Sequence, residues 1–221
     1  MVTFGRPERD EWERRKQNVQ VAPTCIVAPE ASLYYISPPA PLTLNLRLGA
    51  DSHVYSQFNF VLPDARITVG ERCQLGAVNF VCSTSIEVGD DVLMAWGINI
   101  LDSDHHSLYW EERQHDVERC RRDYVESGGR AIGASHDWSV VARKPVRIGS
   151  KSWIGFNAII LKGVTLGEGV IIAPGSVVTH DIPAWTMAGG NPCKPIRRIE
   201  PTRPKDHANA AGGDRPWVEA S

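Results

Sequence analysis

A six-residue period in the second half of the chain constrains its fold more than any other feature. From residue 148 the sequence divides without a gap into the hexads IGSKSW, IGFNAI, ILKGVT, LGEGVI, IAPGSV and VTHDIP. A period of six fits neither an exposed strand, which repeats every ~2 residues, nor an amphipathic helix, which repeats every ~3.6. It predicts a β-solenoid in which each hexad forms a short strand and a turn, and three hexads close a triangular coil. The first position of each hexad is aliphatic and is expected to point inwards: Ile148, Ile154, Ile160, Leu166, Ile172 and Val178.

The same period recurs earlier in the chain, with one irregularity. Hexads begin at Val69, Leu75 and Val81, and after one extra residue a second set begins at Val88. Still earlier aliphatic and aromatic positions indicate a further coil that starts at Leu48. The sequence therefore predicts about five stacked coils, whose inward residues form one continuous column. The set that begins at Val88 continues with Met94 and Ile100, and the coil that starts at Leu48 continues with Val54 and Phe60.

One segment interrupts the period, and the ends of the chain depart from it. The fold is predicted to be all-β. A loop is expected to leave one corner of the coil at about 106–146, with 107–146 as the inserted residues, because this segment is polar and the period resumes in register after it. Residues 1–47 are predicted to form an N-terminal extension, with a short helix in 1–18 and an extended proline-rich segment at 36–42. Residues 48–199 then form the coil domain, and 200–221 a flexible tail.

Composition excludes several classes of function. The formal net charge is −2, the pI is near 6.4, and no long basic run occurs, so a nucleic-acid partner is not expected. No apolar run approaches the ~18–20 residues of a membrane span, and the charged N-terminus lacks the apolar centre of a signal peptide. The 5 cysteines form no CxxC pair and are odd in number, as is typical of reduced thiols. We therefore expect a cytoplasmic protein.

The stretch ILDSDHHSL, residues 100–108, holds two adjacent histidines next to two aspartates. By residue type the pair is compatible with a metal site, with a general base and its orienting acid, or with two surface side chains. The hexad frame makes Ile100 the last inward residue before the loop, so Asp102 to Ser107 lie where the chain leaves the coil. Histidine titrates near ~6.5, so at neutral pH an imidazole there is mostly free to accept a proton.

The segment from Gly149 to Ile199 resembles the C-terminal half of the hexapeptide-repeat acyltransferases. Its most specific parts are WIG, GVTLGEG, APGSVV and AGGNPCKPIRR, and the resemblance covers roughly residues 48–199. It is closest to galactoside, maltose and xenobiotic acetyltransferases and to O-acetyltransferases of surface-polysaccharide pathways. The resemblance implies a left-handed parallel β-helix, an exception to the right-handed crossover rule. It also implies a homotrimer with active sites between subunits, acetyl-CoA as co-substrate, no metal, and a saccharide or a nucleotide- or lipid-linked sugar as acceptor.

In this family one histidine beside the loop removes the proton from an acceptor hydroxyl, whose oxygen then attacks the thioester. The family pattern DxxxHS matches Asp102 to Ser107, which places His106 at the catalytic position and His105 at the variable position before it. The other ring nitrogen of such a base needs an acceptor, and we expect Asp102, Asp104 or a backbone carbonyl to provide it. No base accompanies Cys193, so direct transfer is expected.

The resemblance extends to the acceptor pocket. Asn79 matches an inward-facing asparagine that lines this pocket; the alternative is an asparagine ladder at a coil corner. The loop residues Trp110, Glu111 and Arg113, together with His105, combine aromatic and polar groups suited to a sugar. A charged, solvated helix is the alternative for this part of the loop.

The resemblance also marks positions for the coenzyme, with ordinary coil packing or solvated charge as the alternative at each. Trp153 matches a tryptophan beside the thioester and the pantetheine arm. Small residues allow a close approach of the backbone, and Lys194 and Arg197 match basic residues near the phosphates. His180 stands where the family has lysine, which weakens that contact. The remaining matched positions are Gly155, Ala173, Pro174, Gly175 and Thr179.

Three other functions stay open. A metal-dependent hydratase of the γ-carbonic anhydrase kind needs three histidines on one zinc, and the histidines at 105, 106, 115, 136 and 180 do not have the required spacing. A non-catalytic β-helix that acts as a scaffold is the second alternative. N-acetylation of an amino-sugar nucleotide is the third, because the coil does not distinguish an amine from a hydroxyl.

Overall fold

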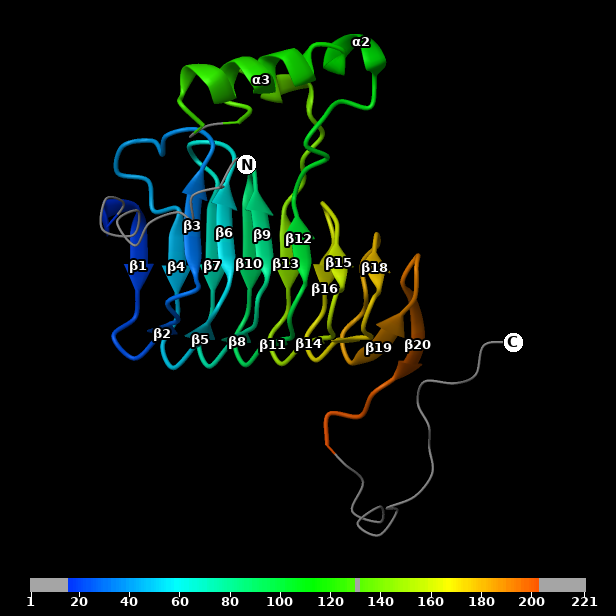
Figure 1. Ribbon diagram of the computed structural model, residues 1–221. Helices are drawn as coiled ribbons and strands as arrows, with labels where there is room; N and C mark the ends of the chain where they lie inside the picture. Colours follow the sequence, from blue (N-terminus) through cyan, green and yellow to red (C-terminus); the bar gives the residue numbers. More distant parts are fainter. Residues whose placement is uncertain (1–15, 130–131, 203–221) are drawn as a thin grey trace.

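Three parallel sheets form the sides of an elongated coil in the computed structural model, which describes residues 16–129 and 132–202 (Figure 1). The chain visits the sheets, named A, B and C, in turn, so that each round of the coil adds one strand to every sheet. Residues in neighbouring rounds pair in parallel register; Ile86, for example, pairs with Ile67 and with Val146. Sheet A contains β1 (Val19–Val21), β4 (Leu46–Leu48), β7 (Arg66–Val69), β10 (Ser85–Val88), β13 (Val146–Ile148) and β16 (Thr165–Leu166).

The other two sheets complete each round. Sheet C contains β3 (Ser32–Tyr35), β6 (Gln57–Phe60), β9 (Asn79–Cys82), β12 (Asn99–Leu101), β15 (Ile159–Ile160) and β18 (Val177–Val178). Sheet B contains β2 (Ile26–Val27), β5 (His53–Val54), β8 (Gln74–Leu75), β11 (Leu93–Met94), β14 (Trp153–Ile154), β17 (Ile171–Ile172), β19 (Thr186–Gly189) and β20 (Lys194–Arg198). The last two strands form an antiparallel hairpin at the C-terminal end of the coil.

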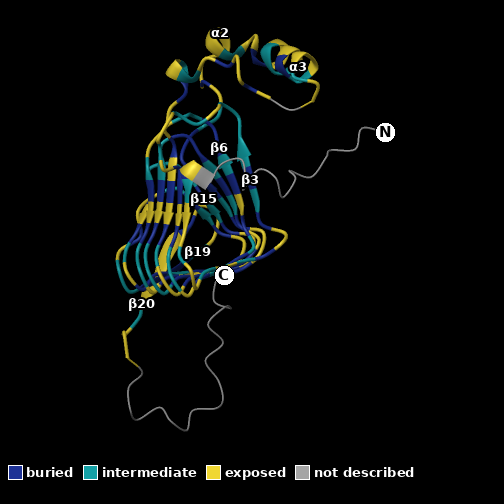
Figure 2. Ribbon diagram, turned by 90° about the vertical axis from the view of Figure 1, so that its left-hand side faces the viewer, coloured by how far each residue is buried: buried dark blue, intermediate teal, exposed yellow. Residues whose placement is uncertain are grey.

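The predicted inward column of the second half is confirmed. Its six aliphatic residues, from Ile148 to Val178, are each at most 2% exposed and belong to one continuous core. Burial of each such side chain stabilises the fold by about 1.5–3 kcal/mol relative to an exposed one. Figure 2 shows buried and exposed residues alternating along the strands of the coil, and many exposed residues along its turns and on the helical insertion.

The register of sheet C differs from the prediction at one hexad. Val81 was expected to point inwards, but Phe80 does: it is fully buried and pairs with Phe58 and Ile100. Val81 is half-buried on the outer side. The turn before β9 is one residue shorter than its counterparts in later rounds, and because side chains alternate along a strand, this shift exchanges the inward and outward positions.

The predicted N-terminal boundary of the coil is wrong. The coil begins at Val19 and not at residue 48, because β1, β2 and β3 pair with β4, β5 and β6 and form a further round. The described residues therefore hold six rounds, with six strands in sheet A and six in sheet C. The proline-rich segment at 36–42 connects β3 to β4. Apart from the short helix η1 (Lys16–Asn18), the helix expected in 1–18 lies outside the described residues, as does the tail from residue 203.

The interruption is a helical insertion, so the fold is not purely all-β. The chain leaves the coil after β12, forms α2 (Trp110–Arg113), α3 (Asp116–Glu126) and η2 (Trp138–Val140), and returns at β13. An antiparallel bridge between Ser103 and Arg143 closes its base. In Figure 1 the two helices lie above the edge of the coil at which sheet C passes into sheet A. Among the described residues, no helix is both long and apolar enough to cross a membrane.

Candidate active site

His106 and Asp116 form the closest pair of acid and base side chains in the loop. Nδ1 of His106 lies 2.8 Å from Oδ2 of Asp116, at hydrogen-bond distance. The His106 side chain is 54% exposed, whereas that of Asp116 is 6% exposed. A carboxylate only accepts hydrogen bonds, so this contact favours the tautomer in which Nδ1 carries the proton. Nε2 of His106 is then the nitrogen that is free to accept a proton from a substrate.

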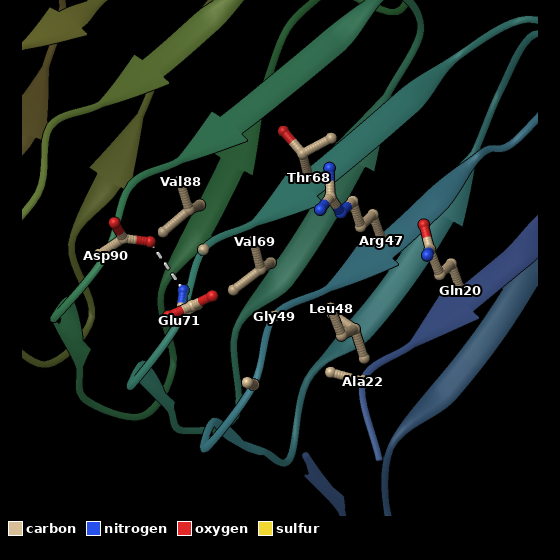
Figure 3. A pocket seen from close by; sticks show the side chains of 12 residues that line it. Gln20, Ala22, Arg47, Leu48, Gly49, Thr68, Val69, Glu71, Val88 and Asp90 are labelled. Carbon is tan, nitrogen blue, oxygen red and sulfur yellow. Dashed lines mark hydrogen bonds between the residues drawn. The ribbon is translucent and has the colours of Figure 1, made fainter. Parts of the chain in front are cut away.

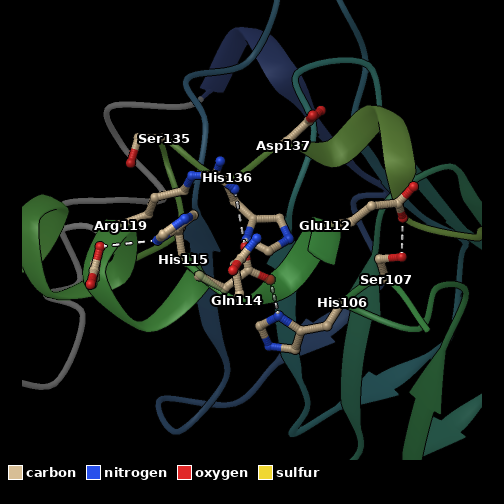
Figure 4. A network of polar contacts seen from close by, with 12 residues as sticks. His106, Ser107, Glu112, Gln114, His115, Arg119, Ser135, His136 and Asp137 are labelled. Atoms are coloured by element: carbon tan, nitrogen blue, oxygen red, sulfur yellow. Dashed lines mark hydrogen bonds and ion pairs between the residues drawn. The ribbon is translucent and has the colours of Figure 1, made fainter. Parts of the chain in front are cut away.

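Local structure explains how the two side chains meet. Asp116 is the first residue of α3, and the partial positive charge at a helix N-terminus stabilises a carboxylate there. At the other side the chain bends at His105, whose φ of 63° lies in the left-handed region that histidine enters more readily than most residues. His106 follows this bend and its ring lies against the start of α3 (Figure 4).

Asp102 does not orient His106, contrary to the prediction. It is fully buried, and its carboxylate accepts hydrogen bonds from the backbone N–H groups of Ser83 and Thr84, both at 2.6 Å. The hydroxyl of Thr84 donates a third bond at 2.9 Å, and the thiol of Cys82 lies 3.4 Å away. With both oxygens occupied, Asp102 fastens the corner after β9 and takes no part in the site.

Asp104 does not orient His106 either. Its Oδ1 lies 2.5 Å from Nζ of Lys162, which belongs to the next round of the coil. The backbone N–H of Asp104 also donates to the carbonyl of Ala142, on the returning side of the loop. Asp104 therefore ties the base of the loop to the coil, and the carboxylate in contact with His106 is that of Asp116.

The second carboxylate oxygen of Asp116 faces two further side chains. Oδ1 lies 3.2 Å from a guanidinium nitrogen of Arg119 and 3.3 Å from Nδ1 of His136. The His136 ring is buried, and it lies edge-on to the His106 ring with 5.2 Å between the centroids (Figure 4). The ring of Trp138 also lies against the His136 ring, with 4.6 Å between the two centroids.

Burial changes the proton affinity of two histidines in the loop. Loss of hydration lowers the pKa of His136 below its ordinary value of 6.5, although the nearby Asp116 carboxylate acts in the opposite direction. Loss of hydration also lowers the pKa of His105, whose ring lies 6.3 Å from that of Trp138. Both side chains are therefore neutral at pH 7.

The residues predicted to bind the acceptor lie near His106 but differ in their availability. Trp110 and Glu111 are exposed, in the first turn of α2. Arg113 already donates to the carbonyl oxygens of Ser107 and Leu108, at 3.0 and 2.6 Å, so it holds the loop that follows His106. His105 is partly buried against Trp138.

Asn79 belongs to an asparagine ladder. Its Oδ1 accepts a hydrogen bond from Asn59 at 2.8 Å, and its amide nitrogen donates to Asn99 at 3.0 Å. The three asparagines lie on the outer side of sheet C. Asn79 pairs in register with Asn99, whereas Asn59 bonds to Asn79 from a position two residues beyond the register partner Gln57. The resemblance implies that Asn79 points inwards, but its side chain lies on the outer side of the sheet. The ladder alternative accounts for its contacts.

The positions predicted to bind the coenzyme separate into two groups. Thr179 and His180 lie at the corner between sheets C and A, the corner from which the loop emerges two rounds earlier, and their side chains approach to 2.8 Å. The others lie on sheet B, on its terminal hairpin or at the corner between sheets B and C, across sheet C from His106: Trp153, Gly155, Ala173, Pro174, Gly175, Lys194 and Arg197.

Side chains in this second group also differ in exposure. Gly155 and Ala173 are buried, and a Cβ on Gly155 would lie 2.7 Å from the backbone nitrogen of Pro174, so coil stacking alone requires glycine there. Gly175, with a φ of +69°, faces open space, and Trp153 is 47% exposed. An exposed aromatic pair that the sequence did not single out, Trp96 and Phe156, stacks at 5.8 Å on the same corner.

A shallow groove elsewhere on the coil lacks the groups of such a site. It lies at the corner where sheet A passes into sheet B, and it is lined by Arg47, Glu71 and Asp90 among mostly small and aliphatic residues (Figure 3). The loop emerges from a different corner, between sheets C and A. The Asp90 carboxylate there accepts a hydrogen bond from the backbone of Glu71 at 2.8 Å, so it belongs to the turn structure.

Three functional candidates were missed or misassigned from the sequence. The sequence pattern assigned no role at the site to Asp116, Arg119 or His136. The structure brings them to one point, although His136 is 20 residues beyond Asp116 in the chain. An acid at the start of a predicted helix was the one local signal for Asp116.

Comparison with protein families identifies the repeat. A model of the bacterial transferase hexapeptide repeat matches residues 145–180, and a model of the hexapeptide repeat of succinyl-transferase matches residues 66–101. The chain thus contains hexapeptide repeats in both of these segments. The two matched segments lie on either side of the helical insertion, in agreement with a coil that the loop interrupts once.

The hexapeptide-repeat protein has relatives that are named as acetyltransferases. One from Staphylococcus aureus is 49% identical over 65 residues, which are 29% of this chain and 33% of the relative. One from Mycobacterium tuberculosis is 28% identical over 158 residues, which are 71% of this chain and 45% of the relative. The chain thus spans less than half the length of these curated relatives.

Solved structures share the fold. AntD, an N-acyltransferase from Bacillus cereus in complex with dTDP and 3-hydroxybutyryl-CoA, superposes with a TM-score of 0.60 and 15% identity, over 89% of this chain and 92% of AntD. A hexapeptide-repeat-containing acetyltransferase from Vibrio cholerae gives a TM-score of 0.52 and 22% identity, over 87% and 83% of the two chains.

Proposed function

We propose that this hexapeptide-repeat protein transfers an acetyl group from acetyl-CoA to a hydroxyl of a saccharide or polysaccharide precursor, with His106 as general base. The observation that carries the proposal is the 2.8 Å contact between Nδ1 of His106 and Asp116, combined with the exposure of the His106 side chain. The acetyltransferase names of the relatives support the reaction class.

The proposed chemistry follows from the tautomer of His106. Nε2 accepts the proton of the acceptor hydroxyl while its oxygen attacks the carbonyl carbon of the thioester. The bond from that carbon to sulfur then breaks, and the sulfur of CoA takes the proton back from Nε2. Asp116 stabilises the imidazolium that exists between the two proton transfers. A positioned base of this kind contributes about 10²–10⁴ in rate.

We infer that the site is completed by a second subunit of a left-handed, trimeric coil, as the family resemblance implies. In one subunit, Trp153 and the basic residues Lys194 and Arg197 lie across sheet C from His106. A cleft between neighbouring subunits places the coil face of one next to the loop of the other. Acetyl-CoA is then held by the exposed groups, Trp153, Gly175, Lys194 and Arg197, with Thr179 and His180 nearer the loop.

A screen for release of CoA thiol tests the reaction. The purified protein is incubated with acetyl-CoA and panels of glycosides, oligosaccharides and nucleotide sugars, with amino sugars as a separate panel. Acceptor-dependent thiol release with the hydroxyl panel and its loss in His106→Ala is the expected result. Release with amino sugars alone would replace O-acetylation by N-acetylation. If His106→Ala retained the full rate, the coil would act as a scaffold.

A metal-dependent hydratase is the competing function that one observation favours. His106, Asp116 and His136 offer ligand atoms that all lie within 4.8 Å of one another, and two imidazoles with one carboxylate form a known zinc ligand set. The guanidinium of Arg119, 3.2 Å from Oδ1 of Asp116, opposes a cation at that point. One equivalent of zinc per chain, together with hydration of CO2 and no thiol release, would establish the hydratase.

A further inference from the structure

We propose that His136 is a positioning residue: as a neutral imidazole it holds the Asp116 carboxylate in the orientation in which that carboxylate serves His106. The inference rests on the proposed function of His106 as a base. It assigns a role to a buried histidine that belongs neither to the hexad pattern nor to the residues matched by resemblance.

The geometry places His136 on the far side of the same carboxylate. Asp116 offers Oδ2 to Nδ1 of His106 at 2.8 Å and Oδ1 to Nδ1 of His136 at 3.3 Å. Contacts on both oxygens restrict rotation of the carboxylate about its Cβ–Cγ bond. Without His136, the partly exposed Arg119, which donates to Oδ1 at 3.2 Å, is the remaining side-chain contact on that oxygen among the described residues, so the carboxylate is held less firmly towards His106. Displacements of about 1 Å in such an arrangement cost about 10²-fold in rate.

The surroundings of the two ring nitrogens favour one tautomer of His136. Nδ1 of His136 lies 3.3 Å from Oδ1 of Asp116, and because a carboxylate cannot donate, this contact favours the tautomer with the proton on Nδ1. Nε2 of His136 is buried and has no hydrogen-bond partner among the residues that the structure describes. A neutral ring with a bare Nε2 leaves one acceptor unpaired, whereas a charged ring would leave an N–H and part of a positive charge unpaired, which is more costly.

The groups around His136 act in both directions on its charge. Asp116 and Asp137 favour the protonated ring, while His106 and Arg119 disfavour it, and burial disfavours it most. The ring of Trp138, whose centroid lies 4.6 Å from that of His136, shields the imidazole from water. Burial therefore favours the neutral form of His136.

Two substitutions separate positioning from packing. His136→Phe keeps an aromatic ring against Trp138 but removes the donor to Asp116; we expect kcat to fall about 10- to 100-fold, with KM for acetyl-CoA within about twofold of wild type. His136→Asn removes the ring but restores an N–H near the position of Nδ1, and we expect it to recover part of kcat. Thermal unfolding of both variants records the packing cost independently. A folded His136→Phe protein with kcat within twofold of wild type would overturn the proposal.

A measurement without turnover keeps this inference distinct from the proposed function. Long-range 1H–15N correlation spectra of the wild-type protein at pH 7.5, assigned with the same variants, report which ring nitrogen carries the proton. We expect His136 to be protonated on Nδ1 only. Protonation on Nε2, or on both nitrogens, would overturn the positioning role. Wild-type protein that shows this tautomer but transfers no acyl group to any acceptor would instead contradict the proposed function.

Discussion

Nδ1 of His106 and Oδ2 of Asp116 lie 2.8 Å apart, although ten positions and the helix α2 separate the two residues in the chain. The contact joins the point at which the chain leaves the coil to the first turn of α3. It makes the helical insertion part of the catalytic apparatus that we propose, and not only a cover for the acceptor.

His106→Gln should abolish most acyl transfer while leaving the fold intact. Glutamine cannot take up the proton, so we expect kcat to fall about 10²- to 10⁴-fold. The side chain is 54% exposed, and thermal unfolding should change little. His105→Gln is the matched control, because that residue lies beside His106 but faces Trp138; a larger loss in His105→Gln than in His106→Gln would move the base to position 105.

Asp116→Asn and Asp102→Asn should have opposite effects. Asparagine at 116 presents no full charge to the imidazolium, so we expect kcat to fall about 10²- to 10⁴-fold, with a smaller loss of stability than at 102 because His106 and Arg119 are more exposed than the partners of Asp102. Asparagine at 102 loses charged hydrogen bonds to the N–H groups of Ser83 and Thr84 in a buried position. We expect that variant to lose about 3 kcal/mol of unfolding free energy. Urea unfolding and steady-state kinetics on both proteins separate the loss of stability from the loss of activity.

Phe80→Ala and Val81→Ala test the register of sheet C. Phe80 is fully buried and stacks on Phe58 with 5.2 Å between ring centroids, so its truncation should cost about 3–5 kcal/mol of unfolding free energy. Val81 lies half-buried on the outer side, and its truncation should cost less than about 1 kcal/mol. Equal costs, measured by chemical unfolding, would show that the strand is shifted by one residue.

Stability should decrease as the pH falls below about 6.5. The folded protein lowers the pKa of His105 and His136, so on acidification the unfolded chain binds protons at these positions before the native state does. Bound protons then favour unfolding, and the free energy of unfolding rises with pH through this window. Chemical unfolding between pH 5.5 and 7.5 checks the sign, and His136→Phe should flatten the dependence. If the unfolding free energy of this variant depended on pH as strongly as that of the wild type, the dependence would arise from other groups.

Lys194→Ala and Arg197→Ala should weaken binding of acetyl-CoA. Both side chains are exposed on the terminal hairpin, where they can meet the phosphates of the coenzyme. We expect KM for acetyl-CoA to rise about 3- to 10-fold and kcat to change little, with a smaller effect at high salt. Arg72→Ala, at a corner where the guanidinium already pairs with Asp91, serves as control and should leave KM unchanged.

Much of the coil was predictable because each hexad carries its own signal. The inward column from Ile148 to Val178 and the in-register return of the hexads at Ile148 were both derived from residue spacing. The rounds before it were less predictable. At Phe80 a shortened turn shifts the frame, and β1 to β3 carry no clean hexad, because aromatic residues and a long corner replace the aliphatic repeat.

Of the residues in the candidate site, His106 was the one whose place was predictable from the sequence. His106 lies in a local motif at the edge of the period, whereas Asp102 and Asp104, its neighbours in sequence, turned out to bond elsewhere. Proximity along the chain is a poor guide at a corner, because a buried carboxylate is bound by whichever N–H groups surround it.

The repeat by itself therefore determined the parallel coil, its axis of aliphatic side chains and the place where the loop leaves it, since a six-residue period can bury one position per hexad in only one way. Which acid meets His106 was decided by the tertiary structure alone. The loop has no period, and the contacts of Asp116 with His106, Arg119 and His136 depend on how α3 packs and not on the spacing of these residues.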